Sequence, residues 1–448
     1  MKKEKTGRFP VYQVADNLKR ILQEQGFRFV DDGDGDEVEK YETTYAMWEE
    51  PEEAFGWAKD PIKLRQGHTI LRTRILPAYL NHKFWDTKEV EIPKRLAGYG
   101  RVYRNNEEHQ IYHQIEGAFL EPLFLEEWFT FLKKIVGEFL EHQEACEIRI
   151  EGETSYQILL KTEGKERCVG WTGLLAEKVF QKCKMEMQTG YFFLLDIEQI
   201  AMEHFEIETI EDLYDNNVER LKRHANDSDA VGDSFICKAV DILRELGYQE
   251  TCGEVLYSKD VYKKMNMIQE SWDKNNSGYP LCEKLGDLNA LRTVLTPATE
   301  EILAYNYKLG NQDVRTFEVS HIYLPRDGKI LPKEHIAITM GAYGDGVNID
   351  TFREDVSEFL KRFGLENTYY VGSGMATAYK WNECYVIMDE EDDYLGSNCG
   401  QISRKAQKNY GIGTTAFMAN FELTALVESL CGTKKSKKEK MKAEMDRD

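Results

Sequence analysis

The sequence predicts an α+β protein with two related domains in tandem, each a mostly antiparallel sheet flanked by helices. Two observations lead to this prediction: a long internal repeat, and strand pairs joined by hairpins beside helical segments. The chain has 448 residues, and a prior of about 150 residues per domain allows two or three units. The repeat favours two.

The repeat consists of two short matches at nearly the same spacing. Ile21–Phe27 returns 221 positions later as Ile242–Tyr248, and both segments are typical of a helix that ends at a glycine before a strand. Leu71-Arg72-Thr73 returns 220 positions later as Leu291-Arg292-Thr293. The shared order and spacing indicate domain duplication. We place the boundary between residues 226 and 227, in a polar stretch.

Local patterns assign elements to each half. In the first half, apolar spacing predicts helices and alternation predicts strands at the following places: helices 11–26 and 126–141, strands Gly100–Arg104 and Tyr112–Leu120. In the second half we expect a helix at Thr299–Lys308 and strands at Val314–Leu324 and His335–Gly341. Residues 433–448, rich in lysine and glutamate, are expected to form a charged, disordered tail.

Composition excludes several protein classes. The chain carries 58 Lys and Arg against 79 Asp and Glu, a net charge of −21, which argues against a general nucleic-acid coat protein. No stretch approaches the roughly 18 apolar residues of a membrane-spanning helix, and no apolar run follows the charged N-terminus as in a secretory signal. Nine cysteines without Cys-x-x-Cys spacing argue against a thiolate zinc site and suggest a cytoplasmic protein with reduced thiols.

The acidic run from Asp31 to Glu37 superficially resembles a calcium-binding loop. Counted from Asp32, the sixth position is Glu37, where such a loop needs glycine for its sharp turn. We therefore interpret the run as a solvated turn.

The first-half hairpin carries side chains suited to substrate chemistry. Alternation places Gln114 and Glu116 on one face, with Arg104 near the end of the partner strand. A guanidinium can hold a phosphate or carboxylate, while the amide and carboxylate accept from an amine. The pattern suits an amino acid activated by ATP. The alternative is a polar hairpin face whose charges pair with each other.

The segment Gly-Arg-Val-Tyr-Arg, residues 100–104, with Tyr-His-Gln-Ile-Glu-Gly, residues 112–117, resembles motif 2 of class II aminoacyl-tRNA synthetases. Specifically, it is similar to the α subunit of phenylalanyl-tRNA synthetases. Three further segments agree in order: Leu71–Pro77, Gly170–Phe180, and Gly190–Met202, which resembles motif 3. Residues 291–319 resemble the synthetase-like domain of the β subunit, which is catalytically silent in the family.

The resemblance covers roughly residues 9 to 430. It implies an α-like catalytic core at 1–226 fused to a β-like, catalytically silent synthetase domain at 227–432, followed by the tail at 433–448. It implies ATP and Mg²⁺ as cofactors, with Glu198 as a magnesium ligand. The implied residues are Arg104, Glu198 and Gln199 for catalysis; Arg74, Leu76, His113, Gln114, Glu116, Gly170, Trp171 and Gly173 for the substrate; and Arg104, Glu107, Asp196 and Gln199 for the nucleotide.

Motif 3 departs from the family pattern. Gln199 stands where the family has an arginine that contacts the ATP γ-phosphate, and a neutral amide offers no charged fork. Losing such a clamp typically lowers a rate by about 10² to 10³. Leu194 and Asp196 replace two glycines, so we expect their side chains to crowd the adenosine site. We also expect Asp196 to repel phosphates unless Mg²⁺ lies between them.

The substrate side also departs from the pattern. Arg74 stands where the family has histidine, and Leu76 stands where it has serine. The family has an acidic residue two positions after the motif 2 arginine, and this sequence has Asn106 there. Glu107 and Glu108 are the candidate substitutes for that acid. No coiled-coil arm precedes the core, and no separate anticodon-binding domain is recognised.

Three functions follow as hypotheses. The first is ATP-dependent activation of a small amino or carboxylic acid as an acyl-adenylate, with transfer RNA a doubtful partner. The second is a catalytically lapsed paralogue that binds an amino acid or regulates, and the third is a phenylalanine–tRNA ligase. We expect a cytoplasmic chain without membrane partners. A homodimer through the helix around residues 14–26 is proposed, with packing inside one chain as the alternative.

Overall fold

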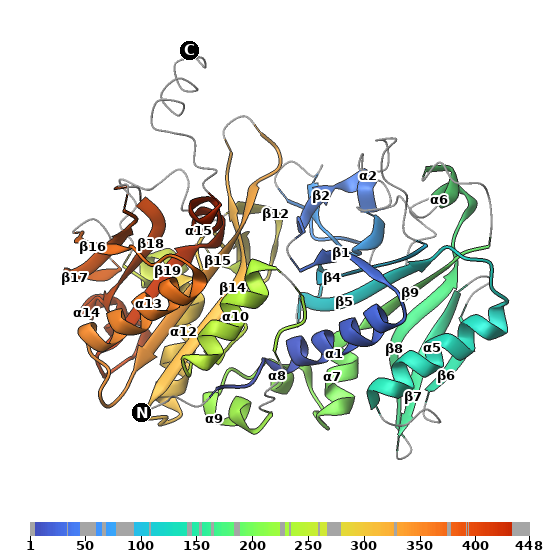
Figure 1. The fold of residues 1–448 in the computed structure, drawn as a ribbon, viewed down its shortest axis with the longest axis horizontal. Helices are drawn as coiled ribbons and strands as arrows, with labels where there is room; N and C mark the ends of the chain where they lie inside the picture. Colours follow the sequence, from blue (N-terminus) through green and yellow to red (C-terminus); the bar gives the residue numbers. More distant parts are fainter. Residues whose placement is uncertain are drawn as a thin grey trace, which may run out of the picture.

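The structure is a computed structural model (Figure 1). It describes all residues except 1–4, 34, 45–59, 65–68, 78–93, 107–108, 141–145, 152–154, 163–164, 183–188, 225–228, 233, 259, 267–278, 327–328, 374–377, 391, 393 and 432–448. Glu107, the boundary at 226 and 227, and the C-terminal tail therefore lie outside the described residues. Within the described part, no helix is long and apolar enough to cross a membrane.

The first half is built on a seven-stranded sheet. Its strand order is β1 (Arg28–Asp32), β4 (Arg95–Tyr103), β5 (Ile111–Phe119), β9 (Tyr191–Asp196), β8 (Lys165–Leu174), β7 (Ser155–Thr162) and β6 (Cys146–Ile150). All neighbouring pairs are antiparallel except β1 with β4. Both predicted hairpin strands are confirmed, although β4 begins earlier than expected and Arg104 lies just beyond its end.

The second half repeats this topology strand for strand. Its order is β10 (Gln249–Glu250), β14 (Val314–Leu324), β15 (Lys333–Tyr343), β19 (Ala416–Glu422), β18 (Tyr394–Ile402), β17 (Tyr379–Met388) and β16 (Tyr369–Gly372). The one parallel pair, β10 with β14, occupies the same place as β1 with β4. The shared order confirms two related α+β units with mostly antiparallel sheets.

Three helices pack on one face of each sheet. In the first half these are α1 (Pro10–Glu24), α5 (Leu125–Leu140) and α7 (Ile197–His204), which share one core with the sheet. In the second half, α10 (Phe235–Glu245), α13 (Ile349–Phe363) and α15 (Leu423–Leu430) do the same. The opposite face of the second sheet carries α12 (Thr296–Lys308) and α14 (Arg404–Tyr410). The helices predicted at 11–26, 126–141 and 299–308 are confirmed within a few residues.

Shorter elements connect these layers. They are β2 (Val38–Lys40), α2 (Tyr41–Thr44), β3 (Thr69–Leu71), α6 (Glu177–Lys182), α8 (Ile210–Leu213), α9 (Val218–Leu221), the 3₁₀ turn η4 (Lys222–His224), β11 (Leu256–Tyr257), α11 (Val261–Lys264), β12 (Tyr279–Leu285) and β13 (Leu288–Leu291).

The first repeated segment ends α1 and α10 in the same way. Gly26 and Gly247 both have a left-handed backbone, with φ of 83° and 81°. The next residue donates backwards into each helix, Phe27 to Leu22 O (3.0 Å) and Tyr248 to Leu243 O (3.1 Å). A strand starts one residue later in both halves, so the glycine is required to turn the chain from helix to strand.

The second repeated segment holds a buried arginine against the hairpin. Arg72 Nε donates to Arg101 O (2.7 Å), and Arg292 Nε donates to His321 O (2.9 Å). Both arginine side chains are buried, and each is paired with an acid, Asp31 in the first half. A Cβ at Gly100 would clash with the Arg72 guanidinium, so this glycine makes room for the arginine.

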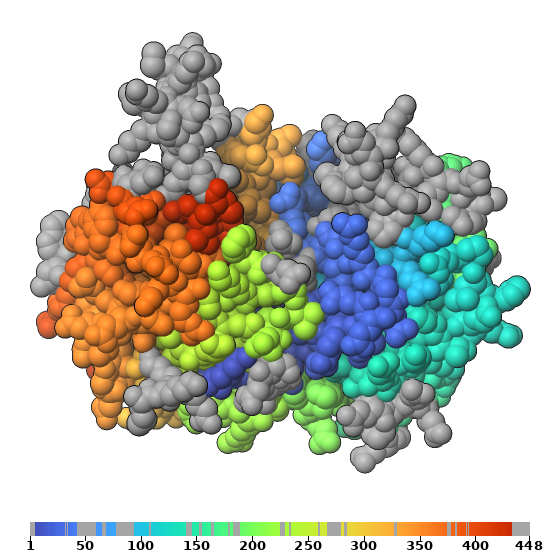
Figure 2. Space-filling view, in the orientation of Figure 1, coloured from blue at the N-terminus to red at the C-terminus, as the bar shows by residue number. Residues whose placement is uncertain are grey.

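The two halves meet around an internal pseudo-twofold axis. The hydroxyls of Tyr103 and Tyr323, 220 positions apart, are 3.0 Å from each other. Arg101 Nη2 lies 3.1 Å from Nδ1 of His321, again 220 positions away, and Arg101 Nη1 donates to Ser320 Oγ (2.6 Å). The space-filling view shows α1 (blue) beside α10 (yellow-green) where the halves join (Figure 2). We call this contact the seam.

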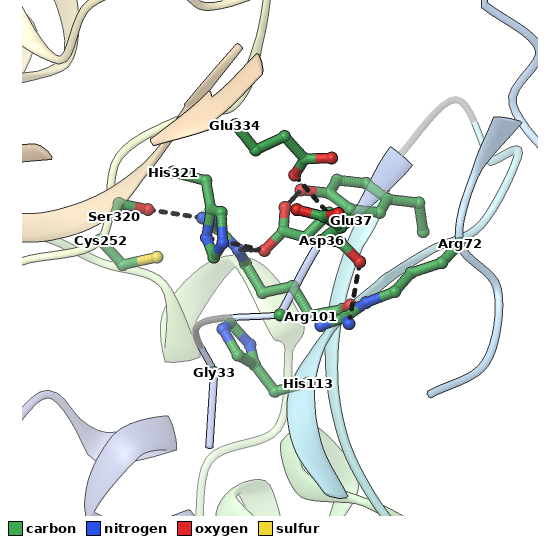
Figure 3. Close-up of polar contacts among 12 residues, drawn as sticks. Gly33, Asp36, Glu37, Arg72, Arg101, His113, Cys252, Ser320, His321 and Glu334 are labelled. Carbon is green, nitrogen blue, oxygen red and sulfur yellow. Dashed lines mark hydrogen bonds and ion pairs between the residues drawn. The ribbon is translucent and has the colours of Figure 1, made fainter. Parts of the chain in front are cut away.

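The carboxylate of Glu37 lies at the centre of the seam (Figure 3). It accepts from Arg101 Nε (2.9 Å) and from the hydroxyls of Tyr103 and Tyr323. Burial alone would raise the pKa of Glu37, but the adjacent Arg101 holds that pKa well below its ordinary value. Burial lowers the pKa of His321 to about 4, so the neutral ring accepts from Arg101.

The interpretation of residues 31–37 as a solvated turn is wrong for its two ends. Asp31 and Glu37 are 2% and 1% exposed. Asp31 accepts from Arg72 (2.8 Å) and from the backbone of Gly33 and Gly35. Tyr323, a partner of Glu37, belongs to the second half. The sequence of the acidic run alone gives no sign of this partner.

The helix proposed as a homodimer interface packs inside the chain. Its apolar side chains, including Val11, Val14, Leu18 and Leu22, are fully buried against the first sheet and the neighbouring helices. This agrees with the alternative of packing within one chain. Homodimerisation itself stays a prediction.

We expect Glu37→Gln to lower the free energy of unfolding by about 3–5 kcal/mol, because it leaves the buried Arg101 without its counter-charge. Urea unfolding of the full chain at neutral pH measures this. Glu354→Gln, at an exposed position of α13, is the matched control and should be neutral. Equal stability of the two variants would contradict the central role of Glu37.

A second prediction concerns Glu334, which accepts from the backbone N–H groups of Glu37 and Val38 (both 2.8 Å). Burial and the nearby Glu37 carboxylate raise the pKa of Glu334 to about 8 from an ordinary value of 4.5. As the pH rises, the unfolded chain therefore releases this proton near pH 4.5 and the folded chain releases it near pH 8. Between these two pH values the group lowers stability as the pH rises, by about 1.4 kcal/mol per pH unit.

Glu334→Gln removes this titration, so its unfolding free energy should fall less steeply with pH than that of the wild type. Urea titrations at pH 5, 6, 7 and 8 give the two slopes, and Glu354→Gln should keep the wild-type slope. Identical slopes for the wild type and Glu334→Gln would contradict a raised pKa at Glu334.

Candidate functional site

The predicted substrate residues Gln114 and Glu116 lie on the face of the first sheet opposite α1, α5 and α7. On β5, Ile115 points into the helix-covered core, so alternation directs Gln114 and Glu116 to the opposite face. Register pairs Gln114 with Gly100 on one side and with Asp196 on the other. The hairpin and the end of β9 therefore bring motif 2 and motif 3 residues together.

The carboxylate of Glu116 is bound by residues 74–76. It accepts from Arg74 Nε (2.7 Å) and from the backbone N–H groups of Ile75 (3.1 Å) and Leu76 (3.2 Å). Arg74 and Glu116 are both 0% exposed. The arginine that replaces the family's histidine thus forms a buried ion pair with the acid expected to bind the substrate amine.

Gln114 joins this pair to Arg104. Its amide is satisfied when the nitrogen donates to Glu116 Oε1 and the oxygen accepts from Arg104 Nη2, each at 3.2 Å. Arg104 Nη2 also donates to Asp196 Oδ2 (2.7 Å), and its guanidinium lies 3.8 Å from the centre of the Tyr112 ring. We name the continuous series Arg74, Glu116, Gln114, Arg104 and Asp196 the ion-pair ladder.

Asp196 has a structural role at the end of the ladder. It is the N-cap of α7 and accepts from the backbone of Gln199 (3.3 Å). Burial raises the pKa of the Asp196 carboxyl, against the opposing effect of Arg104. The Gln199 side chain accepts from Arg167 Nη1 (3.1 Å), a residue of β8 that sequence reasoning did not identify.

Glu198 and His113 lie away from the ladder. Glu198 accepts from the backbone and ring of His113 and from the Tyr214 hydroxyl (2.6 Å). Burial alone would raise the pKa of Glu198, but these donors lower it. His113 also lies edge-on to Tyr12 of α1, on the helix-covered side, so the structure separates it from Gln114 and Glu116.

The remaining predicted substrate residues shape the sheet. Leu76 belongs to an apolar core with Leu96 and Phe180. A Cβ at Gly170 would clash with the carbonyl of Leu194, so this glycine permits close strand pairing. Trp171, which pairs with Leu194, is partly exposed, and Gly173, which pairs with Phe192, is buried.

The residues expected to bind ATP and Mg²⁺ already contact protein groups. Arg104, the side chain that would meet the α-phosphate, is paired with a carboxylate, and Leu194 fills a position where the family has glycine. Both oxygens of Glu198 accept from protein donors, and the described residues contain no group of three or more His, Cys, Asp or Glu able to hold a metal. The ladder in this arrangement does not fit the nucleotide.

The second half has no corresponding ladder among its described residues. Strand register makes Thr339 the counterpart of Glu116 and Leu324 the counterpart of Arg104. Thr339 Oγ1 lies 2.9 Å from Oγ1 of Thr299, and the helix that carries Thr299 packs on this face. The equivalent surface is therefore filled by α12.

Comparison with known proteins finds a separate family match in each half of the chain. Residues 1–224, half of the chain, match the family described as tRNA synthetases class II core domain (F). Residues 233–423 match the phenylalanyl tRNA synthetase beta chain CLM domain.

Individual relatives agree with the two matches. The chain is 26% identical over 202 residues to the phenylalanine–tRNA ligase beta subunit of Clostridium acetobutylicum, covering 44% of this chain and 24% of that protein. It is 26% identical over 230 residues to the alpha subunit of Psychrobacter arcticus, covering 48% of this chain and 62% of that protein. It thus spans less than two thirds of either relative.

Among solved structures, pyrrolysyl-tRNA synthetase from Desulfitobacterium hafniense is similar with a TM-score of 0.36 and 14% identity, covering 44% of this chain and 71% of that one. The core-domain match over half of the sequence decides the family. The chain belongs to the class II tRNA synthetase core-domain family (F), with a first half like the alpha subunit and a second half like the beta subunit of phenylalanyl-tRNA synthetases.

Proposed function

We propose that this chain binds a small amino or carboxylic acid in its first half and does not activate that acid with ATP. The observation that carries the proposal is the Arg104–Asp196 ion pair at 2.7 Å. The Arg104 side chain is 16% exposed, whereas Asp196 is 1% exposed. A ligand carboxylate has the same charge and shape as the Asp196 carboxylate and can compete for the guanidinium from the exposed side.

ATP is disfavoured at the same position for electrostatic reasons. Its phosphates would have to approach Asp196, a buried acid that already neutralises Arg104. Position 199 offers a neutral amide instead of a second cation, and a missing phosphate clamp typically lowers a rate by about 10² to 10³. A single carboxylate carries less charge than a triphosphate and meets less repulsion.

Transfer RNA is not part of this proposal. The chain carries a net charge of −21, whereas binding to nucleic acid gains most of its affinity from Lys and Arg against phosphates.

One observation favours acyl-adenylate formation as a second candidate. Arg104 keeps its place just beyond the end of β4, and its side chain is 16% exposed. ATP–pyrophosphate exchange with pools of amino and carboxylic acids separates the two candidates. Exchange above background would establish activation and remove our proposal, and acid binding by calorimetry without exchange would support it.

We expect Asp196→Asn to increase the affinity for the acid by roughly tenfold, because it removes the competing charge worth about 1.5 kcal/mol in a charge-assisted hydrogen bond. Asparagine is also a good N-cap, so α7 should remain stable. Isothermal titration of the full chain measures the change.

The control for this variant is Asp350→Asn, in the exposed first turn of α13, which should bind the acid as the wild type does. Weaker binding by Asp196→Asn than by Asp350→Asn would show that Asp196 does not compete with the ligand.

A further inference from the structure

The donors around Glu116 limit which acids the first half can hold. Its two carboxylate oxygens accept from Arg74 Nε, from two backbone N–H groups, and from the Gln114 amide. Three of these donors, from Arg74, Ile75 and Gln114, meet Oε1, and the Leu76 N–H meets Oε2. Each carboxylate oxygen has about two lone-pair sites, so an ammonium group at Oε1 would have to displace one of its donors.

The charges around Glu116 also disfavour an ammonium group at this position. The ion pair between Arg74 and Glu116 joins side chains that are both 0% exposed. An α-ammonium group placed at Glu116 would be a second buried cation beside the Arg74 guanidinium, and like charges repel strongly where water is excluded. The next residue of the ladder, Gln114, has its amide oxygen directed at Arg104, another cation.

We propose that Arg74 is a specificity-determining residue that restricts the ligand of this site to carboxylic acids without an α-amino group. The inference rests on the proposed function, since it names the substrate class of the same site. The ligand carboxylate pairs with Arg104, and the atom next to the carboxyl carbon faces the Arg74–Glu116 pair. A hydrogen, hydroxyl or carbonyl at that atom adds no charge there.

Matched pairs of acids test the inference on the full wild-type chain. The probes are phenylalanine with 3-phenylpropionate, leucine with 4-methylpentanoate, and alanine with propionate, each titrated calorimetrically without ATP. In at least one pair we expect the amine-free acid to bind at least tenfold more tightly. Equal or tighter binding of the amino acid in every pair that binds would overturn the inference and leave the proposed function standing.

If no member of any pair binds, the proposed function fails and the inference fails with it. If an acid binds and also supports pyrophosphate exchange, the proposal that ATP is not used fails, while the preference within the pair still decides the role of Arg74.

Variants then assign the preference to Arg74. Arg74→His, which removes the permanent charge, should shift the ratio within a binding pair towards the amino acid by at least tenfold. Arg74→Lys keeps a cation and should keep the wild-type preference. Arg95→His, which alters a partly exposed Arg–Glu pair on the same sheet, is the matched control and should leave the ratio unchanged.

Circular dichroism and thermal unfolding check that each variant is folded, and the wild-type comparison remains decisive if Arg74→His is not. A ratio in folded Arg74→His equal to that of the wild type would refute the role of Arg74.

Discussion

The Glu37 carboxylate is the interaction on which the arrangement of the two halves depends. It accepts from Arg101 and Tyr103 of the first half and from Tyr323 of the second, and all of these groups are buried (Figure 3). A buried charge is tolerated only when such donors surround it. Since Arg101 and Tyr103 belong to β4, the seam also fixes the strand that ends next to Arg104. The position of the candidate site is thus set from the second half.

The sequence was sufficient to predict the two-domain α+β fold because a duplication leaves a signal at fixed spacing. The matches around Gly26 and Arg72 mark positions where a left-handed turn and a buried guanidinium permit few alternatives. The seam could not be predicted in the same way. Glu37 lies in an acidic run that resembles a solvated turn, and its partners are Arg101, far along the same half, and Tyr323, in the other half. The spacing of 220 between Tyr103 and Tyr323 was the available signal.

For the candidate site, the sequence brought Arg104, Gln114 and Glu116 together but did not predict their pairing partners. Arg104, Gln114 and Glu116 do converge, as alternation along the hairpin requires. The alternative left open by the residues alone, charges that pair with each other, agrees with the Arg74–Glu116 and Arg104–Asp196 ion pairs. Arg74 and Asp196 complete those pairs from outside the hairpin, and their contacts depend on the tertiary fold. His113 shows the converse, because alternation already places it opposite Gln114.

The seam also changes the weight of the motif 2 resemblance. Gly100 gives space to the Arg72 guanidinium, while Arg101 and Tyr103 bind Glu37 and the second half. Only Arg104 of this segment joins the ladder. Three of the five residues in Gly-Arg-Val-Tyr-Arg are therefore explained by folding and by the contact between halves, whatever chemistry the site performs. A chain that had lost adenylate formation would still need these residues to hold its halves together. The resemblance at motif 2 thus supports common descent and fold, and it carries little weight for retained catalysis.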